Sequence, residues 1–330
     1  MDQPLLELRN ASREFKVGGG LGLFSRRIIK AVDAVSFSMP SKPWITALIG
    51  ESGSGKTTIA RMILGLLPPT SGEILYKGRK VSEWIKKNKM EYYREVQPIF
   101  QDPYSIYNPF YRVDRVLEVT IKKFKLASSK KEMRDLMIKA MEDIGLRPED
   151  LLGRYPHQLS GGERQRFMLT RILLIKPRLI VADEPISMID VSLRAIFLDH
   201  LLSFKEKHGI SCLYISHDLH TASYLADNVI ILCYGRIVEE GPKNQVIEDP
   251  LHPYTKLLIS SIPIPDPKRR WTDKIDLTSM ESLKKFRADK GCVFSARCPY
   301  VMEKCLSETP QLKSISQETK VACHLYYSEK

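Results

Sequence analysis

Apolar residues form two kinds of pattern along the chain. Short apolar runs that stop at glycine or acidic residues are typical of buried strands, and apolar residues at steps of three or four are typical of helices. A strand-like run is followed by a helix-like stretch at 44–50 and 56–67, at 177–185 and 191–209, and at 210–218 and 219–226. Strands that alternate with helices predict an α/β fold whose sheet is covered on both faces.

Other segments extend this pattern. Residues 5–15 and 30–40 are predicted to be strands, with a glycine-rich loop at 18–27 between them. Residues 131–145 place Met, Leu and Ile at helical steps, and residues 227–241 have the pattern of a hairpin. The chain is long enough for one large domain with an appendage.

The pattern changes after Gly241. Residues 249–271 contain five prolines and few strand signals, and four of the six cysteines follow them. We therefore place a boundary here, with a main domain at 1–241 and a small C-terminal module at 242–330.

Composition narrows the classes of partner. The chain has 330 residues, 43% of them apolar, and a formal net charge of +12. An excess of basic residues favours nucleotides, nucleic acid or anionic lipid surfaces as partners. A lysine-rich surface exposed to solvent would give the same net charge. No apolar run reaches the roughly 18 residues of a spanning helix, and the first residues lack a secretory pattern. We therefore expect a cytoplasmic protein, in which structural disulfides are rare.

The residues from Gly50 to Thr57, GESGSGKT, match the pattern G-x-x-x-x-G-K-[ST] between a predicted strand and a predicted helix. Glycines let such a loop aim its N–H groups at phosphate oxygens, and the helix N-terminus adds positive charge. We expect Lys56 to reach the β- and γ-phosphates and Thr57 to bind Mg²⁺. The predicted nucleotide-binding residues are Gly50, Glu51, Ser52, Gly53, Ser54, Gly55, Lys56, Thr57 and Thr58.

Two adjacent acids, Asp183 and Glu184, end the apolar run at 177–185. Acids at the carboxyl end of a strand face the crevice where α/β sheets bind ligands. We expect Asp183 to hold Mg²⁺ and Glu184 to polarise an attacking water. The alternative is a helix-capping pair, which the glycine-rich loop disfavours.

The segment LSGGERQR at 159–166 resembles the signature of the ATP-binding cassette (ABC) family. The positions that resemble the family's other motifs are Phe15 in SREF (adenine-stacking aromatic), Gln101 in IFQDP (Q-loop), Asp190 in SMID (D-loop) and His217 in YISHD (switch histidine). The resemblance covers residues 5 to about 240. It implies a P-loop NTPase cassette with a mixed sheet core, an antiparallel β subdomain and a helical subdomain at about 100–172.

The resemblance also implies roles. Ser160, Gly161 and Gly162 would bind the γ-phosphate held by a second ATPase subunit, so that two composite sites form in a head-to-tail dimer. Gln101 would contact Mg²⁺ and the attacking water, and His217 would bind the γ-phosphate. Catalysis would then consist mainly of positioning and charge stabilisation.

Two positions depart from the family pattern. Glu163 stands where the signature usually has Gln, and Met188 with Ile189 replaces the usual Ala-Leu of the D-loop. Neither change removes a phosphate contact, but both can alter dimer closure and leave one of the two sites weak.

Several segments resemble the ATPases of oligopeptide and dipeptide importers. Residues 18–37 resemble the extended front loop of one ATPase type, and DPLHPYTKLLISSIP at 249–263 resembles the HPYT segment. The cysteine-rich stretches at 291–305 and 323–327 resemble the C-terminal tail of the same group. The resemblance implies an ATPase at the cytoplasmic face of the membrane that powers solute uptake.

The resemblance implies three kinds of partner: a second ATPase subunit (a paralogue in a heterodimer), two transmembrane permease subunits and an extracellular solute-binding protein. Nucleic acid is not an expected partner. Residues 102–116 are expected to lie on the permease-docking surface, because their aromatic residues suit an interface, and a simple packed loop is the alternative. Relatives import oligosaccharides or nickel, so the cargo stays open.

A soluble ABC ATPase that acts on ribosomes or nucleic acid would suit the charge, but one cassette without a coiled-coil insertion disfavours it. The tail disfavours an exporter.

Cys292, Cys298, Cys305 and Cys323 are spaced C-x5-C-x6-C-x17-C. Four thiolates suit zinc or an iron–sulfur cluster. The close C-x2-C pairs of most zinc modules are missing, and iron–sulfur ligands have looser spacing, so the residues alone leave both groups open. Family resemblance implies a 4Fe–4S cluster, with Zn²⁺ as the alternative.

The other two cysteines, Cys212 and Cys233, lie in predicted strands and are expected to be small buried hydrophobes. We expect the four-cysteine site to be a structural staple for a module with little core of its own. On this hypothesis, Cys298→Ser would loosen the tail and leave ATP binding at Lys56 intact.

Overall fold

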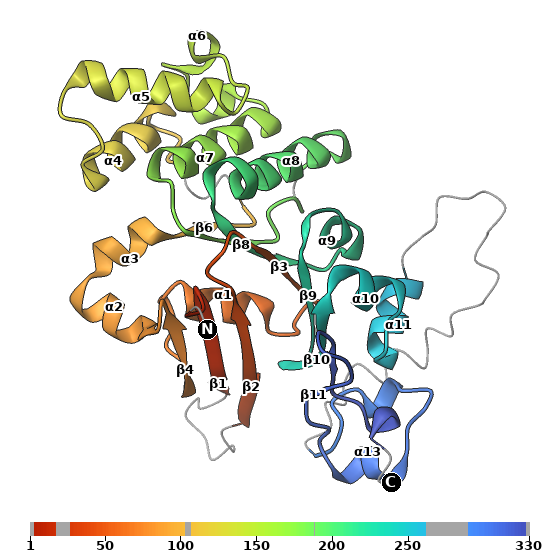
Figure 1. Cartoon of the computed structure of the whole chain (residues 1–330). Helices are drawn as coiled ribbons and strands as arrows, with labels where there is room; N and C mark the ends of the chain where they lie inside the picture. The colour runs from red at the N-terminus through yellow and green to blue at the C-terminus, as the bar shows by residue number, and fades with distance from the viewer. Residues whose placement is uncertain (1–2, 18–26, 103–106, 188, 262–289, 328–330) are drawn as a thin grey trace, which may run out of the picture.

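The computed structural model describes residues 3–17, 27–102, 107–187, 189–261 and 290–327 (Figure 1). Its main sheet has eight strands in the order β11-β12-β10-β9-β3-β8-β7-β6. These are β3 (Ile45–Ile49), β6 (Val96–Ile99), β7 (Leu179–Asp183), β8 (Ser211–Ser216), β9 (Asn228–Cys233), β10 (Arg236–Pro242), β11 (Lys313–Ser314) and β12 (Lys320–Val321). The strands from β9 to β6 pair in parallel and the rest antiparallel, which confirms the predicted α/β sheet and the predicted hairpin.

The central strands are buried on both faces. In β8, Cys212 and Tyr214 belong to one hydrophobic core, and Leu213 and Ile215 belong to the other. Successive side chains on a strand point to opposite faces, so the two cores lie on the two sides of the sheet. Cys212 and Cys233 are 2% and 1% exposed, which confirms that they are buried hydrophobes.

A second, antiparallel sheet has the order β2-β1-β4-β5. Its strands are β1 (Leu6–Val17), β2 (Arg27–Met39), β4 (Ser71–Tyr76) and β5 (Arg79–Lys80). The strands predicted at 5–15 and 30–40 are confirmed, but β2 begins earlier because Val17 pairs with Arg27. Residues 18–26 of the predicted front loop lie outside the described residues.

Helices cover both faces of the main sheet, and α4 and α5 pack against α7 in a further helical layer with α6 beside α5 (Figure 1). The helices up to α9 are α1 (Lys56–Ile63), α2 (Val81–Lys87), α3 (Lys89–Glu95), α4 (Asp114–Phe124), α5 (Lys130–Glu142), α6 (Pro148–Leu151), α7 (Gly161–Ile175), α8 (Val191–His208) and α9 (Leu219–Leu225). Helix α1 ends before its predicted limit of 67, because Gly65 adopts a left-handed φ of 69° that stops a helix. Within the described ranges, no helix has the length and apolar character needed to cross a membrane.

The C-terminal segments return to the main sheet. Strand β12 pairs with β10, where Val321 lies opposite Glu239. The remaining elements are α10 (Lys243–Glu248), α11 (Pro253–Ser260), α13 (Glu303–Ser307) and the 3-10 turns η3 (Ser295–Arg297) and η4 (His324–Tyr326). Cys292 and Phe294 belong to the first hydrophobic core. The module predicted after Gly241 therefore shares a sheet and a core with the part before it.

Glu239 anchors the start of α11 to β10. Its buried carboxylate accepts hydrogen bonds from the backbone N–H groups of Leu251 and His252, at 2.8 and 2.9 Å, and from the Thr255 hydroxyl. The His252 Nδ1 accepts the Tyr254 N–H at 3.0 Å and caps α11. Burial lowers the pKa of His252 to about 4, so the ring is neutral at pH 7. The HPYT segment thereby begins α11 and places Tyr254.

Candidate active site

The phosphate loop joins β3 to α1, and close packing explains two of its glycines, Gly50 and Gly55. A Cβ on Gly50 would lie 2.2 Å from the Leu232 carbonyl oxygen. Gly55 has a φ of 108°, and a Cβ there would lie 2.3 Å from the Ala31 carbonyl oxygen. Both approaches are too short for any side chain. The loop is also held from the β9–β10 turn, because the Gly235 N–H donates to the Ser54 carbonyl at 2.7 Å.

Lys56 lies at the start of α1 with its ammonium group inside the loop. Its Nζ donates to the carbonyl oxygens of Gly50 and Glu51, at 2.7 and 2.9 Å. The side chain is buried, and this burial lowers its pKa while nearby carboxylates oppose the shift. A cation enclosed by the glycine-rich loop is suited to bind phosphate oxygens, as predicted from the sequence.

Thr57 and Asp183 come together from α1 and β7. The Thr57 hydroxyl donates to Asp183 Oδ1 at 3.3 Å. Burial raises the pKa of Asp183, and the Thr57 hydrogen bond and the charge of Lys56 counteract this rise. A hydroxyl and a carboxylate on adjacent elements supply the oxygen ligands that Mg²⁺ prefers. These two residues therefore fit the magnesium site predicted for them.

Glu184 and His217 meet at the carboxyl ends of β7 and β8. The His217 Nδ1 lies 3.4 Å from Glu184 Oε1. Glu184 has a left-handed φ of 46°, and its N–H donates to the Ile215 carbonyl at 2.9 Å. A non-glycine residue in this conformation is strained, and such strain is concentrated at functional sites. The turn keeps the Glu184 carboxylate beside the imidazole.

The predicted signature begins helix α7. Ser160 caps it by accepting the Glu163 N–H, and the Glu163 carboxylate accepts both the N–H and the hydroxyl of Ser160, at 2.7 and 2.8 Å. This capping box explains how glutamate is accommodated at a position where the family usually has glutamine. Gly161 is exposed, and a Cβ on Gly162 would lie 2.5 Å from a Leu193 methyl carbon.

The remaining predicted residues are spread over three elements. Phe15 is half-buried on β1 with the Arg13 guanidinium 5.1 Å from its ring centre, and Asp190 stands at the N-cap position of α8 without a side-chain capping hydrogen bond. Gln101 is exposed just after β6, at the sheet edge that carries Asp183. Met188 lies outside the described residues. No contact of these side chains distinguishes a role in nucleotide binding from a structural one.

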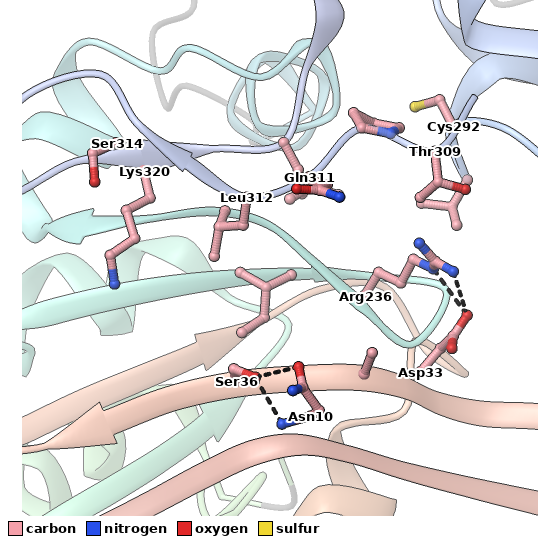
Figure 2. A pocket seen from close by; sticks show the side chains of 16 residues that line it. Asn10, Asp33, Ser36, Arg236, Cys292, Thr309, Gln311, Leu312, Ser314 and Lys320 are labelled. Atoms are coloured by element: carbon pink, nitrogen blue, oxygen red, sulfur yellow. Dashed lines mark hydrogen bonds and ion pairs between the residues drawn. The ribbon is translucent and has the colours of Figure 1, made fainter. Parts of the chain in front are cut away.

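A separate cavity of about 730 Å³ lies between the antiparallel sheet, β10 and the C-terminal module (Figure 2). Its Arg236 forms an ion pair with Asp33 at 2.8 Å, and its Lys320 pairs with Glu240 at 3.3 Å. None of the residues predicted to bind ATP or Mg²⁺ lines it. With these charges paired inside the protein, the cavity indicates no particular ligand.

The four C-terminal cysteines are close enough to influence one another. The pKa of Cys292 is raised to about 11, mainly by burial and to a smaller extent by the other three thiols. Burial also raises the pKa of Cys298 and Cys323. In each of the three, a backbone N–H two residues further along hydrogen-bonds the sulfur and lowers the pKa. Such bonds stabilise thiolates. Nevertheless, no three potential ligands among the described residues converge on a metal-binding point.

Two contacts to the phosphate loop were not predicted from the sequence. The Tyr254 hydroxyl accepts the Glu51 N–H, and the Arg297 guanidinium binds the Glu51 carboxylate. Both come from segments after residue 241, and although Tyr254 lies in the HPYT segment, no pattern in the sequence links either residue to the phosphate loop. An arginine between two clustered cysteines was the available signal, but it did not reveal a partner.

The phosphate loop, the acids at the strand ends and the signature helix on this fold define an ATP-binding cassette ATPase. The family described as "ABC transporter" matches residues 32–187, and the family described as "Oligopeptide/dipeptide transporter, C-terminal region" matches residues 238–305. A solved dimeric ATP-binding cassette with ADP and Pi aligns with a TM-score of 0.61 and 25% identity, over 72% of this chain and 98% of that chain.

Similarity to curated proteins extends along nearly the whole chain. The chain is 37% identical to the putative oligopeptide transport ATP-binding protein YkfD of Bacillus subtilis, over 98% of this chain and 96% of the relative. It is 35% identical to the oligopeptide transport ATP-binding protein OppF of Haemophilus influenzae, over 97% of this chain and 96% of the relative. The chain therefore belongs to the ATP-binding subunits of the oligopeptide and dipeptide ABC transporter family, as the motifs predicted.

Proposed function

We propose that this chain binds Mg²⁺ and ATP on the loop from Gly50 to Thr58 and hydrolyses the nucleotide to power peptide import. The proposal rests mainly on two contacts beside the loop that encloses Lys56. Thr57 contacts Asp183, and His217 contacts Glu184. These contacts join residues from separate motifs at one edge of the sheet. A helix cap made of Asp183 and Glu184 would not require them.

In the proposed reaction, the Lys56 ammonium leaves its carbonyl partners and binds the β- and γ-phosphates. Water attacks the γ-phosphorus while the bond to the β–γ bridging oxygen breaks, and ADP leaves. Glu184 accepts the water proton, and His217 holds the carboxylate and contacts the γ-phosphate. Mg²⁺ bound by Thr57 and Asp183, with Gln101 nearby, would neutralise phosphate charge.

The signature residues Ser160, Gly161 and Gly162 serve the ATP bound by a second subunit. They lie at the N-terminus of a 15-residue helix, where N–H groups and the helix dipole favour an anion. Asp190 at the start of α8 belongs to the same dimer contact, and Phe15 stacks on adenine. The similarity to a solved dimeric cassette supports this arrangement.

Two transmembrane permease subunits are the proposed membrane partners. An apolar groove of about 360 Å³ lies between α1, α3 and α4, and three of its exposed side chains are Leu66 (56%), Met90 (42%) and Val119 (47%). Phe110, in the segment predicted to dock the permease, is 84% exposed. We assign the groove to a short permease helix, and on this assignment the chain works at the cytoplasmic face of the membrane.

Peptides are the proposed cargo, because curated relatives over nearly the full length are oligopeptide transport subunits. A paralogous ATPase and an extracellular solute-binding protein complete the proposed importer. The test is uptake by the reconstituted complex. A Lys56→Ala subunit should lose ATP binding and uptake of a labelled tripeptide. Uptake of nickel or an oligosaccharide instead of peptide would overturn the cargo.

The four C-terminal cysteines are proposed to hold a 4Fe–4S cluster, with zinc as the alternative. The donor set fits a thiolate-bound group: four neighbouring thiols, three of which accept a backbone N–H bond. Because the thiols do not converge in the described arrangement, binding would require the cysteine side chains to move together. Absorption near ~400 nm with matching iron and sulfide would support the cluster, and anaerobically purified protein containing only zinc would contradict it.

A further inference from the structure

The C-terminal module contacts the phosphate loop through one arginine. Arg297, in η3 directly before Cys298, donates to both carboxylate oxygens of Glu51, at 2.9 and 2.8 Å. The two residues are 246 positions apart in the sequence. Two parallel hydrogen bonds fix the orientation of a carboxylate as well as its position.

The arginine is held more firmly than the glutamate. Its side chain is 14% exposed, whereas that of Glu51 is 41% exposed. The guanidinium lies 5.9, 5.8 and 5.3 Å from the ring centres of Tyr234, Tyr254 and Phe294, within range of cation–π attraction. Aromatic packing therefore sets the place of Arg297 in advance, and Glu51 is the partner that it holds.

A second contact holds the backbone of the same residue. The Glu51 N–H donates to the hydroxyl of fully buried Tyr254 at 2.9 Å. The Glu51 carbonyl accepts the Lys56 ammonium at 2.9 Å and the Ser54 N–H at 3.2 Å. A continuous set of contacts thus runs from the C-terminal module through one residue to the phosphate-binding lysine.

We propose that Arg297 and Tyr254 are positioning residues for the phosphate loop, and that they make ATP affinity depend on the C-terminal module. Neither residue touches the nucleotide in this proposal, because both act through Glu51. The inference rests on the nucleotide site proposed above.

The charge of Glu51 gives the proposal a distinctive consequence. Arg297 neutralises a carboxylate that lies in a loop built to receive the negative phosphates of ATP. Removing Arg297 both loosens the loop and leaves that carboxylate to repel the nucleotide. Removing the charge of Glu51 also breaks this ion pair, but it leaves no carboxylate to repel the nucleotide. Arg297→Ala should therefore be costly in the natural chain and nearly harmless when Glu51 is already Gln.

The test is a double-mutant cycle on ATP affinity with the full-length chain. The variants are Arg297→Ala, Glu51→Gln and both together, each titrated with Mg²⁺ and ATP under non-hydrolysing conditions. Arg297→Ala should raise the dissociation constant for ATP about tenfold. This estimate takes the usual free energy of a charge-assisted hydrogen bond and reduces it because solvent screens the partly exposed pair. The double variant should bind like Glu51→Gln alone. In hydrolysis, KM should rise with little change in kcat.

Two further variants keep this test decisive. Lys304→Ala, in the same module beside Glu308, is the matched control and should bind ATP normally. Tyr254→Phe removes one hydroxyl and should weaken binding about threefold even if Arg297→Ala folds poorly. Normal affinity in both Arg297→Ala and Tyr254→Phe, or the same penalty with and without the Glu51 charge, overturns the proposal. Normal binding by Lys56→Ala would instead overturn the nucleotide site itself.

Discussion

The phosphate loop and the C-terminal module place their residues in different ways. The loop's residues are consecutive in the chain, and a strand, a tight turn and a helix position them locally. The module's residues are positioned by partners far away in sequence, such as β10 for Val321 and the ring of Tyr234 for Arg297. The first arrangement can be read from a motif, but the second depends on tertiary packing. The predictions below test where one arrangement depends on the other.

The largest effect is expected at the chemical step. Glu184→Gln keeps the shape of the side chain but cannot accept the water proton, so ATP hydrolysis should fall by about 10²–10⁴. ATP binding should remain. The measurement is phosphate release at saturating ATP. Glu206→Gln, an exposed position on α8, is the control, and hydrolysis above a tenth of normal in Glu184→Gln would reject Glu184 as the base.

The next effect tests whether the module folds as part of the cassette. Phe294 is 1% exposed and packs against the rings of His252 and Tyr254, at 5.9 and 5.3 Å. Phe294→Ala should lower the free energy of unfolding by about 3–5 kcal/mol. Urea unfolding should show one transition shifted as a whole. An early separate transition for the module would contradict the shared core. Tyr300→Ala, at an exposed position, is the control and should change the free energy of unfolding by less than about 0.5 kcal/mol.

A pH dependence follows from the buried histidine of the HPYT segment. The folded pKa of His252 is about 4, below its ordinary value of 6.5, so the unfolded state binds a proton first as pH falls. The stabilising contribution is complete above pH 6.5 and is lost as pH falls towards 4, by about 3 kcal/mol in total.

The measurement is the free energy of unfolding at pH 7.5, 6 and 5. Asparagine can accept the Tyr254 N–H at the helix cap but does not titrate. His252→Asn should therefore reduce the loss of stability between pH 7.5 and 5. An equally steep loss in this variant would show that other groups are responsible.

The smallest effect is expected at the signature. Hydrogen bonds from Ser160 lower the pKa of Glu163, so its carboxylate is charged at neutral pH beside the proposed γ-phosphate position. Glu163→Gln keeps an oxygen for the cap but removes the charge, and should lower the KM for ATP about twofold to fivefold. A higher KM would mean that the carboxylate matters more as a cap than as a source of repulsion.

The sequence predicted the parts of the fold and site that depend on local pattern. The continuous burial of β8, the ends of α8 and the closeness of Thr57 to Asp183 and of Glu184 to His217 all agree with it. Helices α2 and α3 were not predicted, because each has only seven residues and one buried side chain, too short for a clear period. The Arg297–Glu51 pair could not be predicted, because the periodicity of apolar residues indicates local secondary structure and not a contact between distant segments.

The same contact changes the expectation for the cysteines. A staple separate from the cassette would leave ATP binding intact when Cys298 is replaced. In the structure, however, Arg297 is covalently next to Cys298 and binds the phosphate loop. Loosening this segment is therefore expected to disturb both the module and the loop.

The most direct measurement is the affinity of full-length Cys298→Ser for ATP with Mg²⁺, taken together with hydrogen exchange of residues 290–327. Our account predicts faster exchange in the module together with weaker ATP binding. Faster exchange with unchanged affinity would contradict it, because the phosphate loop would then be independent of the C-terminal module.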